Sequence, residues 1–444
     1  MILKSISKIV YLVFFLVVLT GFFLLSSCGE DESPATLKAD FSFEFIDDNN
    51  VRITNLSEGE YFLLDWDFGN GQTASNSQIN QTYEMYYPEA GTYTIRLTVI
   101  DYDSNRETVT KDVVITKNDL VVLFSATPDG SNPNRINLVN TSEGEYDSFK
   151  WIFRGKEVEN ETNTVAYFPF KGTYQIELQI TKGSNTFTEK QSISISNDDP
   201  GYISSFTLTW ADEFDGNEVN LSDWTFETGS NGWGNNELQN YTNGDNAEVK
   251  DGKLIITAKK INDNQVAGSY TSTRMITKGK QEFTYGKMEI RAKLPSGRGI
   301  WPAIWMLGAN ISDVSWPACG EIDIMEYVGY MPNTVYATIH TPAGYGAEGD
   351  GSSKTLATAE EEFHIYGLIW TEKEMIFYTD SPENVTHTYS PLNKTDENWP
   401  FNKSQFFILN IAVGGNWGGA QGIDDSIFPQ TMEIDYVRVY QPNE

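Results

Sequence analysis

Residues 320–329 carry the sequence GEIDIMEYVG. This stretch contains three acidic side chains, Glu321, Asp323 and Glu326. A regular β-strand places residues i, i+2 and i+4 on one face, so the third acid, at i+5, would point away from the first two. A β-bulge at about Ile324 or Met325 would return it to their side, with Ile322 facing the core. The stretch therefore predicts a bulged strand of a β-sandwich.

Three carboxylates on one face are electrostatically unfavourable, because like charges a few ångströms apart raise one another's pKa values. A glycosidase needs such a group: one carboxylate attacks the anomeric carbon while another, kept protonated, donates to the leaving oxygen. An exposed acidic face or a cation site is the alternative. Aromatic rings, which stack on the C–H faces of sugars, favour the enzyme interpretation. Aromatic and histidine side chains flank the strand: Trp301, Trp305, Trp316, Tyr327 and His340.

Strand-like runs separated by Gly, Asn, Pro or Asp extend from Phe206 to Tyr440. Aromatic residues make up 13% of the chain, and no long stretch after the N-terminus shows helical periodicity, which fits an all-β protein. A segment of this length is enough for one large β-sandwich. The runs are 253–258, 286–293, 322–327, 334–340, 363–370, 406–413 and 432–440.

An internal repeat precedes this segment. Apolar and polar residues alternate in each copy, as in the strands of a sandwich with one buried face. Trp66 and Trp151 occupy equivalent positions and are expected in the two cores, with a sugar-stacking surface as the alternative. The repeated segments are NLSEGEY (55–61) with NTSEGEY (140–146), and GTYTI (91–95) with GTYQI (172–176).

The N-terminus has the features of an export signal. Lys4 and Lys8 precede an apolar run from Ile9 to Leu25, and the sequence LSSC ends at Cys28. LSSC resembles a bacterial lipoprotein box, which implies lipidation of Cys28; an uncleaved anchor helix is the alternative. The GEDE that follows resembles a surface-export signal, or is a solvated linker. We expect an exported lipoprotein of the outer membrane, at the cell surface.

The formal net charge of −31 argues against a nucleic-acid partner, because phosphate binding requires clustered Lys and Arg. A neutral polymer remains compatible with this charge. The second of the two cysteines, Cys319, is interpreted as a buried thiol rather than a nucleophile, and the mature chain is expected to have no intrachain disulfide.

Residues 206–441 have a clear family likeness. GEIDIME resembles the signature of glycoside hydrolase family 16 in its bulged form, found in laminarinases. The resemblance implies a β-jelly roll with a glycan cleft and double displacement with retention, without a cofactor in catalysis. By position, Glu321 corresponds to the nucleophile, Glu326 to the general acid/base and Asp323 to an assisting acid. The supporting segments are WADEFDG, WGNNELQNYT, YTSTRMIT, YGKMEIRAKLP, GIWPAIWMLG, FHIYGLIW, ILNIAVGGNW and IDYVRVYQ.

Other site residues follow from the same resemblance. The predicted sugar-binding residues are Asn235, Arg274, Trp301, Trp305, His340 and Trp417, each with a structural role as its alternative. The resemblance also implies a structural calcium ion on the convex face, since oxygen ligands suit a hard cation. Its predicted ligands are Glu213, the carbonyl of Gly252, and Asp435.

The repeat copies resemble a second family. WDFGNG (66–71) and GTYTIRLTV (91–99) resemble the PKD domain, an Ig-like β-sandwich. In the second copy WIFRGK (151–156) departs from the pattern, so its assignment rests on the repeat. The expected organisation is a signal peptide (1–27), an acidic linker (28–37), PKD-like domains (38–117 and 118–199) and a family 16 domain (203–441).

The leading functional hypothesis is a retaining endo-hydrolase of β-1,3-glucan (laminarin) or mixed β-1,3/1,4-glucan. The alternatives are the same fold acting on agarose or carrageenan, a transglycosylase, and a non-catalytic glycan-binding protein, which the intact glutamates disfavour. The expected partners are a β-glucan and, through Cys28, the membrane. We expect a monomer.

Overall fold

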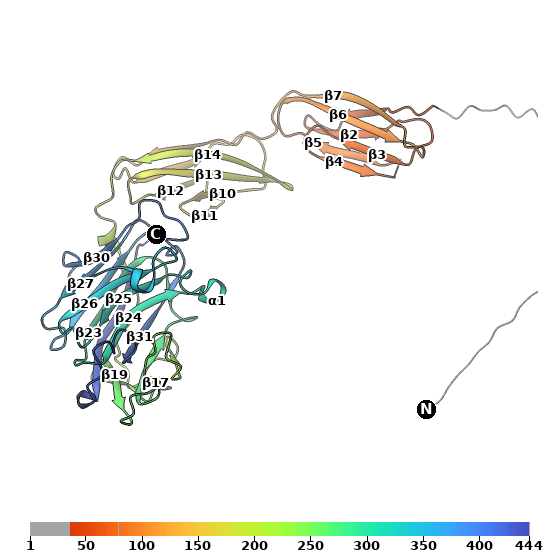
Figure 1. Cartoon of the computed structure of the whole chain (residues 1–444). Coiled ribbons are helices and arrows are strands. Elements are labelled where there is room, and N and C mark those ends of the chain that lie inside the picture. Colours follow the sequence, from red (N-terminus) through yellow and green to blue (C-terminus); the bar gives the residue numbers. More distant parts are fainter. Residues whose placement is uncertain (1–35, 79, 444) are drawn as a thin grey trace, which may run out of the picture. The chain divides into compact units, whose positions relative to one another are not determined.

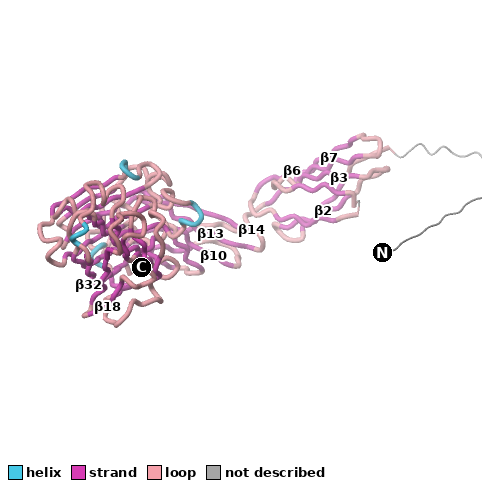
Figure 2. The backbone as a smooth tube through the Cα atoms, turned by 60° about the horizontal axis from the view of Figure 1, so that its bottom comes forward, coloured by secondary structure: helices cyan, strands magenta, loops and turns pink. Residues whose placement is uncertain are grey.

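The computed structural model describes residues 36–78 and 80–443, so Cys28 and the export segment lie outside the described residues. Strands dominate these residues and helical turns are few and short (Figures 1 and 2). The backbone forms two compact units, one comprising most of residues 36–193 and the other residues 129–135, 167–173 and 194–443. The helical turns are η1 (Ile203–Ser205), α1 (Ile311–Val314), η2 (Gly346–Glu348) and η3 (Asp425–Ile427).

The first unit contains a sandwich of two antiparallel sheets within residues 41–115. Its core contains Trp66, which is buried and stacked on Phe68, so the expected packing of this tryptophan is confirmed. One sheet has the order β1 (Phe41–Phe45), β2 (Asn50–Asn55), β5 (Thr82–Tyr86). The other has the order β4 (Thr73–Asn76), β3 (Leu63–Asp67), β6 (Gly91–Ile100), β7 (Arg106–Ile115).

The repeat copy has the same sheet orders. Trp151 is fully buried, as expected, and its indole N–H donates to the carbonyl of Glu161 at 2.9 Å. The three-stranded sheet is β12 (Asn163–Tyr167), β9 (Arg135–Asn140), β8 (Phe124–Pro128). The four-stranded sheet is β11 (Lys156–Glu159), β10 (Ser148–Phe153), β13 (Gly172–Lys182), β14 (Asn185–Ile195).

Residues 207–441 form a larger sandwich of two sheets. The first follows the order β17 (Gln239–Tyr241), β20 (Tyr270–Ser272), β19 (Lys253–Lys260), β32 (Gln430–Gln441), β23 (Gly286–Lys293), β28 (His364–Trp370), β29 (Met375–Thr379), β30 (Val385–Tyr389). In addition, β15 (Thr207–Asp212) pairs with β32, and β18 (Ala247–Lys250) pairs with β19.

The second sheet carries the predicted acidic strand. Its order is β16 (Thr225–Glu227), β21 (Arg274–Ile276), β31 (Gln405–Val413), β24 (Ile300–Gly308), β25 (Glu321–Tyr327), β26 (Thr334–His340), β27 (Asp350–Thr355), with β22 (Glu282–Phe283) also paired to β31. The buried faces of both sheets meet in one core, to which β25 contributes Ile322, Ile324, Met325 and Tyr327. The other face of this sheet is therefore left to build a site.

The seven strand-like runs all form strands, to within two residues at each end. Their pattern did not include β24, because apolar residues occupy consecutive positions in Ile300–Gly308 instead of alternating. Among the residues described, no helix is long and apolar enough to span a bilayer.

Candidate active site

The acidic strand β25 contains the predicted bulge. Between Asp323 and Glu326 the strand advances three residues, while its partner β26 advances only two, from Thr338 to Tyr336. The extra residue falls at Ile324–Met325, and both of these side chains are buried. As a result the three carboxylates line one cavity, while the apolar residues between them pack into the core.

Gly320 fixes the start of this strand. Its φ of +76° lies in the left-handed region, and a Cβ atom there would come within 2.7 Å of the Phe401 ring. A side chain at this position would therefore be both strained and crowded. The glycine lets the chain turn tightly into Glu321, whose backbone pairs with His340 of β26.

The surroundings of the three carboxyl groups favour their protonated forms. Burial, followed by the charges of the neighbouring acids, raises the pKa of Glu321, Asp323 and Glu326. Asp323 is the most enclosed, with 2% of its surface exposed. Because each added charge is costly here, the cluster retains protons near neutral pH instead of ionising completely.

A different indole donates a hydrogen bond to each of the two glutamates. Glu321 accepts the Trp316 indole N–H at Oε2 (2.7 Å), and a side-chain hydrogen bond with Glu321 lowers the pKa of Asp323. Glu326 accepts one indole N–H, from Trp301 to Oε1 at 3.1 Å. Donors stabilise the charged form of a carboxylate. Each glutamate therefore has one indole donor, while burial raises the pKa of Glu321 to about 8 and that of Glu326 to about 7.

His340 approaches the same cluster from β26. Its Nε2 atom lies 3.2 Å from Asp323 Oδ2 and 3.8 Å from Glu321 Oε1. The predicted cleft position of this histidine is thus the observed one. The imidazole therefore lies against both acids, while Asp323 Oδ2 itself has no hydrogen-bond partner among the residues described.

Aromatic rings form the wall next to Glu326. Trp301 meets Trp417 edge-to-face at 5.5 Å, and Trp417 meets Tyr336 at 4.9 Å. Trp417 comes from the glycine-rich loop after β31, where Gly415 approaches the Trp301 ring closely. The rings support one another and leave π surface facing the cavity, as sugar stacking requires.

Arg274 also lines the cavity, where its guanidinium contacts two indole rings. Its guanidinium is 4.9 Å from the Trp233 ring centroid and 4.7 Å from that of Trp305. Its Nε donates to Glu227 at 2.6 Å, while Trp305 donates to Asn410 at 2.7 Å. The cation is therefore fixed in direction and still lines the cavity.

The cavity has a volume of about 1100 Å³. It brings together all three predicted catalytic acids and all six predicted sugar-binding residues, Asn235, Arg274, Trp301, Trp305, His340 and Trp417. Trp316, expected to flank the acidic strand, also lines the cavity, and sequence reasoning missed several other lining residues: Trp233, Glu237, Tyr336 and Asn410.

Two of the missed residues carried a signal. Trp233 begins the motif WGNNELQ, and its φ of +48° shows that the fold holds it in a conformation rare for bulky residues. Glu237 of the same motif is a buried acid whose pKa burial raises, and it accepts from Gln239 at 2.6 Å and Asn235 at 3.2 Å. The polar residues of the motif thus support one another as well as the cavity wall.

The predicted calcium ligands are not assembled as a calcium site. Glu213 accepts two hydrogen bonds from Arg438, at 2.7 and 2.8 Å, and Asp435 accepts one from Arg291 at 2.5 Å. Gly252 lies in the turn between β18 and β19. Since calcium needs several oxygen ligands and both acids already neutralise arginines, these residues do not fit the ion in this conformation.

Cys319 has the predicted character. Its side chain is fully buried, and burial raises the pKa of its thiol to about 11. A protonated, enclosed thiol does not act as a nucleophile.

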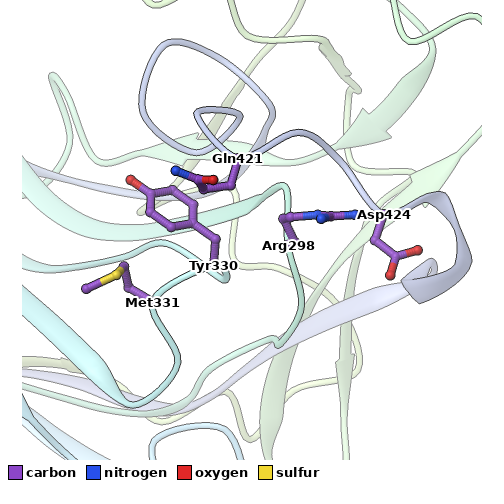
Figure 3. Close-up of a pocket in the computed structure, with 5 residues that line it drawn as sticks. All are labelled: Arg298, Tyr330, Met331, Gln421 and Asp424. Atoms are coloured by element: carbon purple, nitrogen blue, oxygen red, sulfur yellow. The ribbon is translucent and has the colours of Figure 1, made fainter.

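A second cavity, of about 570 Å³, lies among the loops around residue 298 (Figure 3). Asp424 is the one acid among its lining residues, so it lacks the carboxylate pair that glycoside hydrolysis requires. It is lined by Arg298, Tyr330, Met331, Gln421 and Asp424.

Comparison with known proteins agrees with this geometry. Residues 234–438 match the family model "Glycosyl hydrolases family 16". A beta-glucanase from Rhodothermus marinus is 44% identical over 248 residues, which cover 53% of this chain and 85% of that protein. The chain belongs to glycosyl hydrolase family 16. The predictions of a jelly-roll fold and of a glycoside hydrolase are confirmed.

Two further proteins are similar to this chain. A glucan endo-1,3-beta-glucosidase from Cryptopygus antarcticus is 39% identical over 258 residues, covering 54% of this chain and 93% of that protein. The solved laminarinase from Flavobacterium sp. UMI-01 is 47% identical, covers 53% of this chain and 100% of its own, and has a TM-score of 0.50. Residues 30–114 match the PKD domain, which confirms the assignment of the first repeat copy.

Proposed function

We propose that the chain is a retaining endo-hydrolase of β-1,3-glucan or mixed β-1,3/1,4-glucan. The observation that carries this proposal is the bulged strand, which places three buried carboxylates in an aromatic-walled cavity. The beta-glucanase, endo-1,3-beta-glucosidase and laminarinase relatives support this class of substrate. Glycosidases of this family need no cofactor for catalysis.

In the first step, Glu321 attacks the anomeric carbon and forms a glycosyl ester. The glycosidic C–O bond breaks as Glu326 transfers its proton to the leaving oxygen. Glu321 attacks in its charged form, which the hydrogen bond from Trp316 favours. Burial raises the pKa of Asp323 well above its usual range, so this side chain is protonated beside Glu321.

In the second step, a water molecule replaces the departed sugar. Glu326, now a carboxylate, takes a proton from this water as its oxygen attacks the anomeric carbon. The ester bond breaks, Glu321 leaves as a carboxylate, and the configuration at the anomeric carbon is the original one. Trp301 keeps Glu326 directed at the oxygen in both steps through its indole N–H.

The charge of the cavity disfavours sulfated polymers such as carrageenan. Among the residues that line it, Arg274 is the only arginine or lysine, and it is already paired with Glu227. The negative charge that the carboxyl cluster carries during the reaction would oppose a sulfate in the same space. A neutral glucan meets no such repulsion and gains contact with the indole rings.

We also propose that the second repeat copy is a PKD-like domain spanning residues 118–199, within the domain organisation expected from the sequence. Its sheet orders, matching those of the first sandwich, support this assignment. The LSSC motif supports lipidation of Cys28 and anchoring at the cell surface. The proposal includes no calcium ion, because arginines occupy both predicted carboxylate ligands.

A hydrolysis panel tests the function. Laminarin, lichenan, curdlan, agarose, xyloglucan and carrageenan would be compared by release of reducing ends, and products would be sized by chromatography. We expect internal cleavage of laminarin or lichenan and no cleavage of carrageenan. Cleavage of agarose or carrageenan in preference to both glucans would refute the substrate assignment.

A further inference from the structure

An exposed pair of aromatic rings lies on the first sandwich, within the first compact unit. Tyr102, in the turn between β6 and β7, is 74% exposed, and Phe62, just before β3, is 39% exposed. Their ring centroids are 5.4 Å apart and their planes differ by 35°. Apolar rings that stay exposed to water do not stabilise the fold, so the exposed pair indicates a role other than core packing.

The turn that presents Tyr102 is held rigid by its own hydrogen bonds. The Asp101 side chain accepts from the backbone N–H groups of Asp103 (2.9 Å) and Asn105 (2.8 Å), and from the Asn105 amide at 2.8 Å. The Asp101 N–H donates to the Asn105 carbonyl at 3.1 Å. A rigid turn reduces the entropy lost when its tyrosine binds a ligand.

The second sandwich provides an internal comparison. The Phe62 N–H donates to the Ile100 carbonyl at 3.1 Å, and at the matching place the Asp147 N–H donates to the Thr181 carbonyl at 2.9 Å. Asp147 is therefore the counterpart of Phe62, and Gly183, two residues after Thr181, is the counterpart of Tyr102. The same fold forms without either ring, so the rings are dispensable for folding.

Charge and chemistry define the ligand. Three acids, Glu60, Asp101 and Asp103, lie beside the two rings along the chain, against one arginine, Arg106, at the end of the same turn. Anionic polymers and anionic lipid surfaces are therefore disfavoured. Aromatic faces bind the C–H faces of neutral sugars, and adjacent carboxylates accept hydrogen bonds from sugar hydroxyls. A neutral polysaccharide satisfies both requirements.

We propose that Phe62 and Tyr102 form a stacking platform for a neutral β-glucan chain, separate from the catalytic cavity. The choice of β-glucan rests on the proposed function. The platform holds insoluble polymer close to the enzyme and takes no part in bond cleavage. Its contribution therefore depends on the physical state of the substrate.

The test compares the full wild-type chain with Phe62→Ala/Tyr102→Ala. The probes are insoluble curdlan, at amounts below saturation, and a soluble laminari-hexasaccharide. We expect the rate on curdlan and the fraction of enzyme bound to it to fall about fivefold, while the rate on the hexasaccharide is unchanged. Phe45→Ala, at an exposed aromatic outside the platform in the same sandwich, is the matched control and should change neither rate.

Several results would overturn the platform. Unchanged curdlan binding in the double variant, an equal loss in Phe45→Ala, or equal binding to carrageenan would each exclude it. Sedimentation showing a dimer that the double variant abolishes would instead assign the rings to contact between two copies. If wild type failed to cleave laminarin but the double variant still lost curdlan binding, the proposed enzyme function would fail and the platform would stand.

Discussion

The substitution Trp316→Phe separates the two possible roles of this tryptophan. Its indole N–H lies 2.7 Å from Glu321 Oε2, and its ring packs edge-to-face on Tyr345 at 5.2 Å. Phenylalanine keeps an aromatic ring but removes the donor. If the indole stabilises the charged nucleophile, this variant raises the pKa of Glu321; if it only contacts sugar, the pKa stays unchanged.

The size of the effect follows from the hydrogen bond. A hydrogen bond to a charged group contributes about 1.5–3 kcal/mol. Because Trp316 is 43% exposed, solvent weakens the bond and the lower end of this range applies. One pKa unit corresponds to about 1.4 kcal/mol, so the pKa of Glu321 should rise by about one unit.

The assay is the pH profile of kcat/KM on laminarin. Glu321 must be ionised to attack, so a higher pKa moves the acidic limb of the profile to higher pH by about one unit. Trp301→Phe is the matched control, because it removes the donor to Glu326, which must be protonated. A higher pKa for Glu326 moves the alkaline limb to higher pH. An unchanged acidic limb in Trp316→Phe, with only KM altered, would refute the positioning role.

Four further outcomes test the rest of the account. Asp323→Asn should lower kcat about 100-fold with little change in KM, because it changes the charge and proton balance beside the nucleophile; kinetics on laminarin would show this, and unchanged kcat would contradict it. Ile322→Ala should lower the free energy of unfolding of the catalytic domain by about 2–5 kcal/mol, measured by urea denaturation, since the side chain is fully buried; a change below about 1 kcal/mol would contradict its core position. Cys319 should resist iodoacetamide at neutral pH in native protein and react once the protein is unfolded; mass spectrometry showing rapid native labelling would refute its burial. A chelator should shift Tm by less than about 2 °C, because Glu213 and Asp435 are bound to arginines, whereas a large calcium-dependent gain in Tm would restore the predicted metal site.

The sequence was sufficient to predict seven strands of the larger sandwich and the bulge, because these depend on local patterns. Alternation marks a half-buried strand, and the i, i+2, i+5 spacing of acids has a bulge as its simplest solution. Strand β24 escaped this reasoning because its apolar residues occupy consecutive positions, so no period of two exists in Ile300–Gly308. Consecutive residues of this strand are buried because other parts of the fold cover both of its faces, and the local sequence pattern does not show this.

Site residues could be predicted where they belong to a recognisable sequence motif. They could not be predicted where their role depends on contacts formed only in the folded chain. Trp316 lies five residues before Glu321, but its hydrogen bond depends on how the intervening loop folds back. Asn410 lies on β31 and Tyr336 on β26, and strands β24 and β25 lie between these two strands in the sheet. Both residues line the cavity because of the order of the strands, which the sequence does not show. The calcium prediction did not fit because sequence spacing cannot show that Arg438 and Arg291 pair with Glu213 and Asp435.

The most direct test of the central claim is to trap the glycosyl-enzyme intermediate. A 2-deoxy-2-fluoro β-laminaribiosyl reagent with a good leaving group should form a stable ester on the nucleophile, which peptide mass spectrometry would locate. The account predicts a single adduct on Glu321 and none in Glu321→Gln. An adduct on Glu326 or Asp323, or inactivation without any covalent adduct, would contradict it.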